Sequence, residues 1–157
     1  MTDAPARVAA PDDLLALENQ VCFALAVASR SVIGMYRPLL EPLGLTHPQY
    51  LVMLALWERG AHSVRALGEA LRLEPATLSP LLKRLEALGY VRRERDRGDE
   101  RALRVELTAE GRALREKALE VPPAVMRLLG MDASQLASLR DALRAVIAAV
   151  ESAPSRA

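Results

Sequence analysis

The middle of the chain carries the order of patterns that most restricts its fold: two short helices followed by a β-hairpin. Helical spacing over residues 65–71 and again over 76–88, with Gly89 directly after, predicts two short helices joined by a tight turn. A short strand is expected at Val64, just before them. These residues therefore predict a helix-turn-helix.

The segment after Gly89 predicts the hairpin. Residues 90–95 and 102–107 flank the turn at residues 96–99, and the second arm alternates apolar and polar side chains. A hairpin that follows a helix-turn-helix in this way is typical of a winged helix. Its long, charged tip is the wing.

A long helix is predicted before this motif. Apolar residues recur at helical spacing from Leu14 to Tyr36, and Pro38 and Pro42 bound the segment, which indicates a helix of roughly 25 residues. Its apolar stripe is broad enough to pack both on its own domain and on a second subunit.

Capping residues and prolines predict the remaining helices, which cover residues 50–58, 108–118 and 132–150. Thr46 and Gln49 form a capping box for the first, and Asp132 with Gln135 caps the last. Pro122 and Pro123 interrupt the apolar stretch between the second and the third. The expected fold class is mainly α with a small β-hairpin wing, a winged helix-turn-helix flanked by helical extensions.

Length and composition limit the class of protein. The 157 residues are 51% hydrophobic, as expected of one compact domain. Residues 1–11 lack the features of a signal peptide, and no apolar run approaches the ~18 residues of a membrane span. We therefore expect a cytoplasmic protein without a membrane segment. No ligand cluster surrounds His47 or His62, the two histidines, so neither a metal nor a cofactor is expected.

Positive charge gathers in the middle of the chain. The net charge is only +1, from 21 basic and 20 acidic side chains, but residues 65–104 hold ten basic and seven acidic ones. Five arginines fall within ten residues of the hairpin: Arg92, Arg93, Arg95, Arg97 and Arg101. A hairpin tip is thin enough to insert an arginine into a DNA minor groove. The alternative is that Asp96, Asp99 and Glu100 merely neutralise a surface hairpin.

The second helix of the motif carries side chains suited to a DNA major groove. Small or polar residues at its leading end let the backbone approach base edges, and Thr77 and Ser79 supply hydroxyls there. Lys83 and Arg84 lie further along, where they can reach phosphates or a guanine. The alternative is that Lys83 and Arg84 are simply a solvated helix face.

Several blocks resemble the MarR family of winged-helix repressors, over roughly residues 14–118. The family's most recognisable signature is similar to Asp99-Glu100-Arg101 followed by residues 105–111. Five blocks resemble its organic-hydroperoxide-sensing branch, OhrR: residues 22–25, 36–40, 43–46, 48–53 and 81–86. The resemblance implies a homodimer that represses a hydroperoxide-detoxification gene and releases DNA when its N-terminal cysteine is oxidised.

The resemblance also implies roles for wing residues and a division of the chain. It assigns minor-groove insertion to Arg101 and the orientation of basic side chains at the wing base to Asp99. The candidate DNA-binding residues are then Thr77, Ser79, Lys83, Arg84, Arg95, Arg97, Asp99 and Arg101. Residues 1–157 form a single MarR-like domain, with dimerisation parts at 12–60 and 108–152 and a DNA-binding part at 61–107. A dimer with recognition helices roughly 34 Å apart calls for double-stranded DNA with an inverted-repeat operator.

Cys22 is the only cysteine, so an intramolecular disulfide is excluded. A lone free cysteine is commonly a small core hydrophobe, and no Lys, Arg or His lies within four residues of Cys22 to favour the thiolate. Tyr36 lies fourteen positions further on, roughly 21 Å along a helix, so the two side chains can meet only across an antiparallel dimer axis. A phenol there can hydrogen-bond the thiolate.

The resemblance implies the same sensor, with Cys22 assisted by tyrosines from across the interface. Only Tyr36 of the family's three tyrosines is retained, because Ala26 and His47 stand at the other two positions. His47 is a candidate replacement that would make sensing pH-dependent, or else a first-turn residue that points at water. The candidate redox-sensing residues are Cys22, Tyr36 and His47.

Oxidation of Cys22 cannot be resolved within the chain. The sulfenate would persist, form a mixed disulfide with a low-molecular-weight thiol, or proceed to irreversible acids. The competing hypothesis is a MarR-type repressor released by a reversible phenolic or aromatic ligand at the dimer interface, with Cys22 not sensing. A thiol peroxidase is disfavoured because the chain lacks a resolving cysteine, and we expect no enzyme activity.

Overall fold

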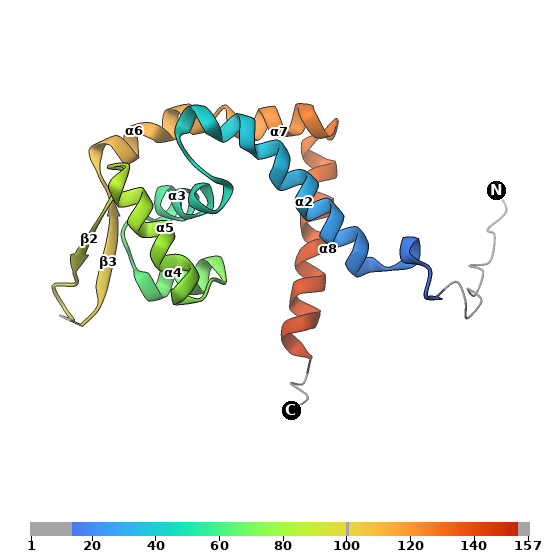
Figure 1. The fold of residues 1–157 in the computed structure, drawn as a ribbon, viewed down its shortest axis with the longest axis horizontal. Coiled ribbons are helices and arrows are strands. Elements are labelled where there is room, and N and C mark those ends of the chain that lie inside the picture. The colour runs from blue at the N-terminus through green and yellow to red at the C-terminus, as the bar shows by residue number, and fades with distance from the viewer. Residues whose placement is uncertain (1–13, 100, 154–157) are drawn as a thin grey trace. The chain divides into compact units, whose positions relative to one another are not determined.

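The computed structural model describes residues 14–99 and 101–153 (Figure 1). It is mainly helical with one small sheet, which confirms the predicted winged-helix class. Contacts divide the chain into two compact units, one ending at Tyr36 and one beginning at Arg37. In chain order the elements are η1 (Leu17–Asn19), α2 (Val21–Leu40), η2 (Glu41–Leu43), α3 (His47–Arg59), β1 (His62–Ser63), α4 (Val64–Leu71), α5 (Pro75–Ala87), β2 (Val91–Arg95), β3 (Leu103–Leu107), α6 (Ala109–Ala118), α7 (Val121–Leu129) and α8 (Ala133–Ser152).

Helix α2 begins later and ends later than the sequence predicts. Gln20 has an extended backbone, with φ −85° and ψ 113°, and its Nε2 donates to the carbonyl of Leu14 at 2.6 Å. The single helix predicted from Leu14 to Tyr36 is therefore wrong, because the regular helix begins only at Val21. Pro38 does not end it either: it lies inside α2, which continues to Leu40 even though the proline removes one backbone hydrogen bond.

The core of the second unit lies where α3, the helix-turn-helix and the sheet meet. Helices α4 and α5 form the predicted helix-turn-helix, and the turn between them starts at Arg72, which has a left-handed φ of 55°. The side chains that are least exposed here come from all these elements: Val52, Met53, Leu56, Leu67, Leu78, Leu82, Leu85, Val91 and Val105. This burial fixes the recognition helix α5 through one face and leaves its other face to solvent.

The sheet contains the predicted hairpin and one short additional strand. Its order is β1-β3-β2, so β2 is an edge strand. Strands β2 and β3 are antiparallel from Val91 opposite Leu107 to Arg95 opposite Leu103. The strand expected at Val64 lies just before it, at His62–Ser63, because the Ser63 hydroxyl caps α4 by accepting from the N–H of Ala66 at 3.1 Å.

The predicted helix caps are confirmed. The N–H of Thr46 donates to Gln49 Oε1 at 2.9 Å, and Asp132 and Gln135 exchange the two bonds of a capping box, each at 2.9 Å. Pro122 and Pro123 lie in the first turn of α7, so the break in the apolar stretch falls between α6 and α7. Within residues 14–99 and 101–153, no helix is both long and apolar enough to cross a membrane.

Two helices carry apolar side chains that their own chain does not cover. Helix α8 has no buried residue among those described. Its exposed apolar side chains are Leu139, Leu143, Val146, Ile147 and Val150. Helix α2 buries only Leu40 and leaves Val21, Phe23, Val27 and Ile33 exposed. Both helices therefore present exposed apolar side chains.

A junction of close backbone contacts ties the hairpin to the helices before and after it. The carbonyl of Tyr90 accepts from the N–H of Thr108 at 3.0 Å, and the Tyr90 hydroxyl donates to the carbonyl of Leu43 at 3.0 Å. Trp57 Nε1 donates to the carbonyl of Gly111 at 2.8 Å. A Cβ on Gly111 would lie 2.0 Å from the carbonyl oxygen of Tyr90, so only glycine fits there.

We expect Gly111→Ala to lower the free energy of unfolding by about 3 kcal/mol, because the methyl group must displace backbone rather than a flexible side chain. Gly98→Ala is the matched control, since its Cβ would only approach Asp96 Oδ1 at 3.4 Å, and we expect a change within about 0.5 kcal/mol. Denaturant unfolding of both variants measures the difference. Equal stabilities would contradict the close approach of α6 to Tyr90.

Candidate nucleic-acid interface and cysteine site

The recognition helix α5 presents all four of its predicted DNA-binding side chains to solvent. Thr77, Ser79, Lys83 and Arg84 are exposed, whereas Leu78, Leu82 and Leu85 on the same helix are buried. At about 100° per residue, Ser79 and Lys83 lie along one side of the exposed face, and Thr77 and Arg84 lie along the other. The hydroxyls and the two cations therefore span the surface that a groove would meet.

The tip of the wing is built by two aspartates that bind backbone. Asp96 Oδ1 accepts from the N–H of Gly98 at 2.8 Å, and Asp99 Oδ1 accepts from the N–H of Arg101 at 3.0 Å. The N–H of Asp96 also donates to the carbonyl of Ala102 at 2.8 Å, which closes the loop. Asp99 thus contacts Arg101 through its main chain, and in the described part of the chain neither aspartate forms an ion pair with a wing arginine.

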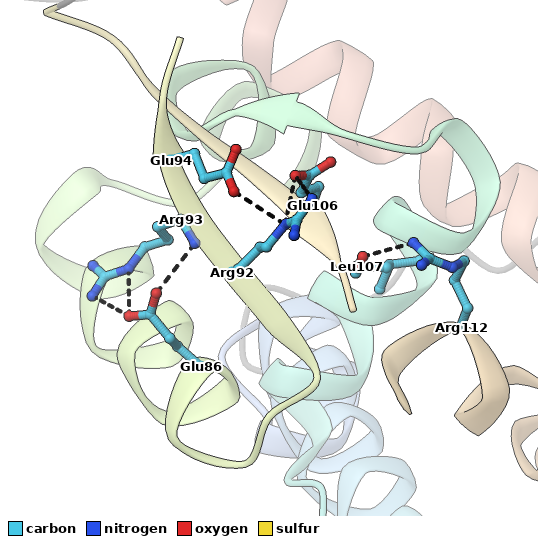
Figure 2. A network of polar contacts seen from close by, with 7 residues as sticks. All are labelled: Glu86, Arg92, Arg93, Glu94, Glu106, Leu107 and Arg112. Atoms are coloured by element: carbon cyan, nitrogen blue, oxygen red, sulfur yellow. Dashed lines mark hydrogen bonds and ion pairs between the residues drawn. The ribbon is translucent and has the colours of Figure 1, made fainter. Parts of the chain in front are cut away.

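The five wing arginines separate into two groups, and Figure 2 shows the two that form ion pairs, Arg92 and Arg93. Arg92 pairs with Glu106 at 2.6 Å and with Glu94 at 3.3 Å, and the hydrogen bond to Glu106 raises the pKa of Arg92. Arg93 pairs with Glu86 at 2.7 Å, and this hydrogen bond lowers the pKa of Glu86. These two arginines at the base of the wing are engaged by carboxylates of the same chain.

The remaining arginines of the wing face solvent. Arg95, Arg97 and Arg101 are exposed at or beside the tip and form no ion pair with any residue in 14–99 or 101–153. The same holds for Arg104, which lies on β3 opposite Glu94 and which the sequence reasoning did not select. The alternation of polar and apolar residues in this arm was the signal that pointed to its exposed side. Four cations are thus available to an anionic partner.

The candidate sensing residues lie in different parts of the chain. Cys22 is exposed in the first turn of α2, and Tyr36 is half-buried near the other end of the same helix. Fourteen positions correspond to about 21 Å of helix, so one chain does not bring these two side chains together. His47 is the first residue of α3, in the second unit, and is half-buried.

Burial sets the protonation of the two aromatic groups. It raises the pKa of the Tyr36 phenol, which therefore stays protonated and able to donate at neutral pH. Burial lowers the pKa of His47, so its imidazole is predominantly neutral at neutral pH. Neither group therefore carries a positive charge at neutral pH, and both contain a hydrogen-bond donor.

Comparisons with known proteins agree with this arrangement. Residues 45–103 match the family model described as the MarR family. The chain is 42% identical over 131 residues to the organic hydroperoxide resistance transcriptional regulator of Bacillus subtilis, covering 83% of this chain and 89% of the relative. It is 46% identical over 141 residues to the HTH-type transcriptional regulator TtmR of Methylorubrum extorquens, covering 85% and 72%.

A solved structure of reduced AbfR bound to DNA is similar as well, with a TM-score of 0.75 and 33% identity over 86% of this chain and 92% of that one. AbfR is a protein of Staphylococcus epidermidis. The names of both relatives describe transcriptional regulators. The chain therefore belongs to the MarR family of DNA-binding transcriptional regulators.

Proposed function

We propose that this regulator is a dimeric repressor that senses organic hydroperoxides through Cys22 and then releases its operator. The observation that carries the proposal is the exposed, single thiol at the start of α2, in a chain 42% identical to an organic hydroperoxide resistance regulator. The exposed face of α5 and the arginine-rich wing supply the DNA-binding half. Thr77, Ser79, Lys83 and Arg84 contact the major groove, and Arg95, Arg97 and Arg101 contact phosphates and the minor groove, with Asp99 shaping the tip.

A second copy of the chain completes the sensor. Helices α2 and α8 each expose several large apolar side chains, which favours a homodimer built from these N- and C-terminal helices. An antiparallel crossing of two α2 helices brings Cys22 of one chain towards the partner's Tyr36. Two-fold symmetry then requires an inverted-repeat operator, with half-sites about one helical turn apart.

The chemistry needs only the thiolate and the hydroperoxide. The Cys22 thiolate attacks the outer peroxide oxygen, the O–O bond breaks, and the leaving alkoxide takes a proton from water, so that the products are a sulfenic acid and the alcohol. The protonated phenol of Tyr36, and the neutral imidazole of His47 in place of a phenol, are suited to hydrogen-bond the thiolate. A low-molecular-weight thiol then condenses with the sulfenic acid, which releases water and leaves a mixed disulfide.

Arg101→Ala tests the wing. We expect binding to a duplex selected by the wild-type protein from a random library to weaken about tenfold, and the slope of log K against log salt to fall by about one. Arg92→Ala is the matched control, because the guanidinium of Arg92 is already paired with Glu106 and Glu94. Wild-type affinity in a gel-shift titration of Arg101→Ala would remove Arg101 from the interface.

Stoichiometric cumene hydroperoxide tests the sensor. We expect mass spectrometry to find one added oxygen or a thiol adduct at Cys22, together with loss of the gel shift, and we expect Cys22→Ser to keep its DNA under the same treatment. Unmodified Cys22 with lost DNA binding would rule the mechanism out. Release of Cys22→Ser by a phenolic carboxylate, with no response of the wild type to peroxide, would favour the reversible-ligand alternative.

Tyr36→Phe tests the contribution of the partner subunit. When the Tyr36 hydroxyl is removed, the Cys22 thiolate loses a hydrogen bond, so we expect oxidation of Cys22 to slow by about tenfold. DNA binding of the reduced protein should be unchanged. The rate of thiol loss under excess hydroperoxide is the measurement. Mixed dimers of Cys22→Ser with Tyr36→Phe then discriminate. If Tyr36 acts across the interface, the remaining Cys22 faces Tyr36 of the partner subunit only when the two substitutions are on different chains, and oxidation should be slow only when they are on the same chain.

A further inference from the structure

Glu86 makes the polar contact between the recognition helix and the wing. Its Oε2 accepts from Arg93 Nε at 3.0 Å and from Nη2 at 2.7 Å, and its Oε1 accepts from the backbone N–H of Arg93 at 3.1 Å (Figure 2). The side chains of Glu86 and Arg93 are 37% and 27% exposed, so solvent screens this contact less than the more exposed ion pair of Arg65 with Glu69. One carboxylate thus holds both the side chain and the main chain of Arg93.

The hydrogen bond from the backbone N–H of Arg93 to Glu86 joins α5 to the free edge of the sheet, because β2 is an edge strand. Among residues 14–99 and 101–153, no strand pairs with the side of β2 that faces away from β3. The N–H of Arg93 lies on that side, where the Glu86 carboxylate takes the place of a strand carbonyl. The hairpin is therefore attached to α5 midway along β2, two residues before Arg95.

We propose that Glu86 is a positioning residue that fixes the wing to the recognition helix, so that both reach DNA as one rigid unit. This inference rests on the DNA-reading residues proposed above, which lie on the two elements that Glu86 joins. Glu86 stands near the C-terminal end of α5, where a carboxylate is disfavoured by the helix dipole, and its two-point contact with Arg93 offsets that cost.

The proposal predicts that removing the negative charge of Glu86 weakens DNA binding, whereas electrostatic repulsion alone predicts that it strengthens binding. Removing an acidic group from a DNA-binding face ordinarily strengthens binding, because the repulsion of phosphates falls. If Glu86 positions the wing, Glu86→Gln weakens binding instead, since the hairpin loses its attachment and the two contacts no longer arrive together. Glu94→Gln is the matched control. This substitution also removes one negative charge, at the position on β2 next to Arg93. Glu94, however, pairs with Arg92 of its own strand and not with α5.

The experiment measures affinities for the selected duplex and for random-sequence duplex of equal length. We expect Glu86→Gln to bind the selected duplex about tenfold more weakly and random duplex with less than about a twofold change, because non-specific binding tolerates a mobile wing. Glu94→Gln should bind both as tightly as the wild type or more tightly. Wild-type affinity of Glu86→Gln for the selected duplex, or an equal loss on both duplexes, would overturn the proposal.

A double-mutant cycle with Arg101 distinguishes positioning from a general loss of stability. Glu86 contacts Arg93, whereas Arg101 lies at the far end of the hairpin, so independent effects would add. We expect Arg101→Ala to cost about tenfold in the wild-type and Glu94→Gln backgrounds and about twofold in Glu86→Gln. If the losses of Glu86→Gln and Arg101→Ala add, the positioning role of Glu86 is overturned but the DNA role of the wing is not. No effect of Arg101→Ala in any background overturns the DNA role of the wing and this inference with it.

The pH profile supplies a signature of the contact itself. The bond to Arg93 lowers the pKa of Glu86, so the attachment is complete above the ordinary carboxyl pKa and is lost only as pH falls through the lowered value. We expect the NMR shift of the Arg93 amide to follow that titration and to be flat over the same range in Glu86→Gln. A flat wild-type profile would overturn the assignment of Glu86 as the partner of this N–H.

Discussion

The close approach of Gly111 to the carbonyl of Tyr90 is the constraint on which the arrangement of the second unit depends. The Thr108 hydroxyl reinforces it, because it donates to the carbonyl of Gly89 at 2.5 Å and accepts from the N–H of Gly111 at 3.0 Å. The two ends of the hairpin, before β2 and after β3, are therefore held together at this contact. Helix α6 begins there, and the same contact fixes its direction. Since Trp57 also bonds Gly111, α3 is held at the same place. The winged helix and the C-terminal helices share this junction as their common origin.

The charges of the wing are divided between structure and binding. Carboxylates from α5 and β3 satisfy Arg93 and Arg92 at the base, where the hairpin must keep its position. At the tip, the carboxylates of Asp96 and Asp99 accept hydrogen bonds from backbone N–H groups and so stabilise the turn. A net charge of +1 for the whole chain therefore conceals a local excess of available cations. An acidic residue in a DNA-binding segment is not evidence against binding when its carboxylate already has a structural partner.

Local signals in the sequence predicted the fold well. Capping boxes and the period-2 alternation of β3 involve residues a few positions apart, so their chemistry can be recognised without the structure. The start of α2 was missed because nothing in the apolar spacing marks the extended Gln20. The Glu86–Arg93 contact was missed for another reason, since it joins a helix to a strand across a turn and depends on which edge of the sheet is open. The candidate DNA-binding residues were proposed from the sequence and stay a prediction, whereas which arginines are already paired required the structure.

The energy available from oxidation is sufficient for the proposed release of DNA. A hundredfold fall in operator affinity corresponds to about 2.7 kcal/mol. Burying a polar group without a hydrogen-bond partner costs about 1–3 kcal/mol, and a dimer contains two Cys22 side chains, so two sulfenates or adducts in an apolar interface reach this value. The change matters only if it disfavours the DNA-binding arrangement of the dimer more than the released one. Cys22 lies in the first unit and the candidate DNA-binding residues lie in the second, and helix α2 (Val21–Leu40) is the element that runs across the boundary between them, so the proposed release would have to act through this helix.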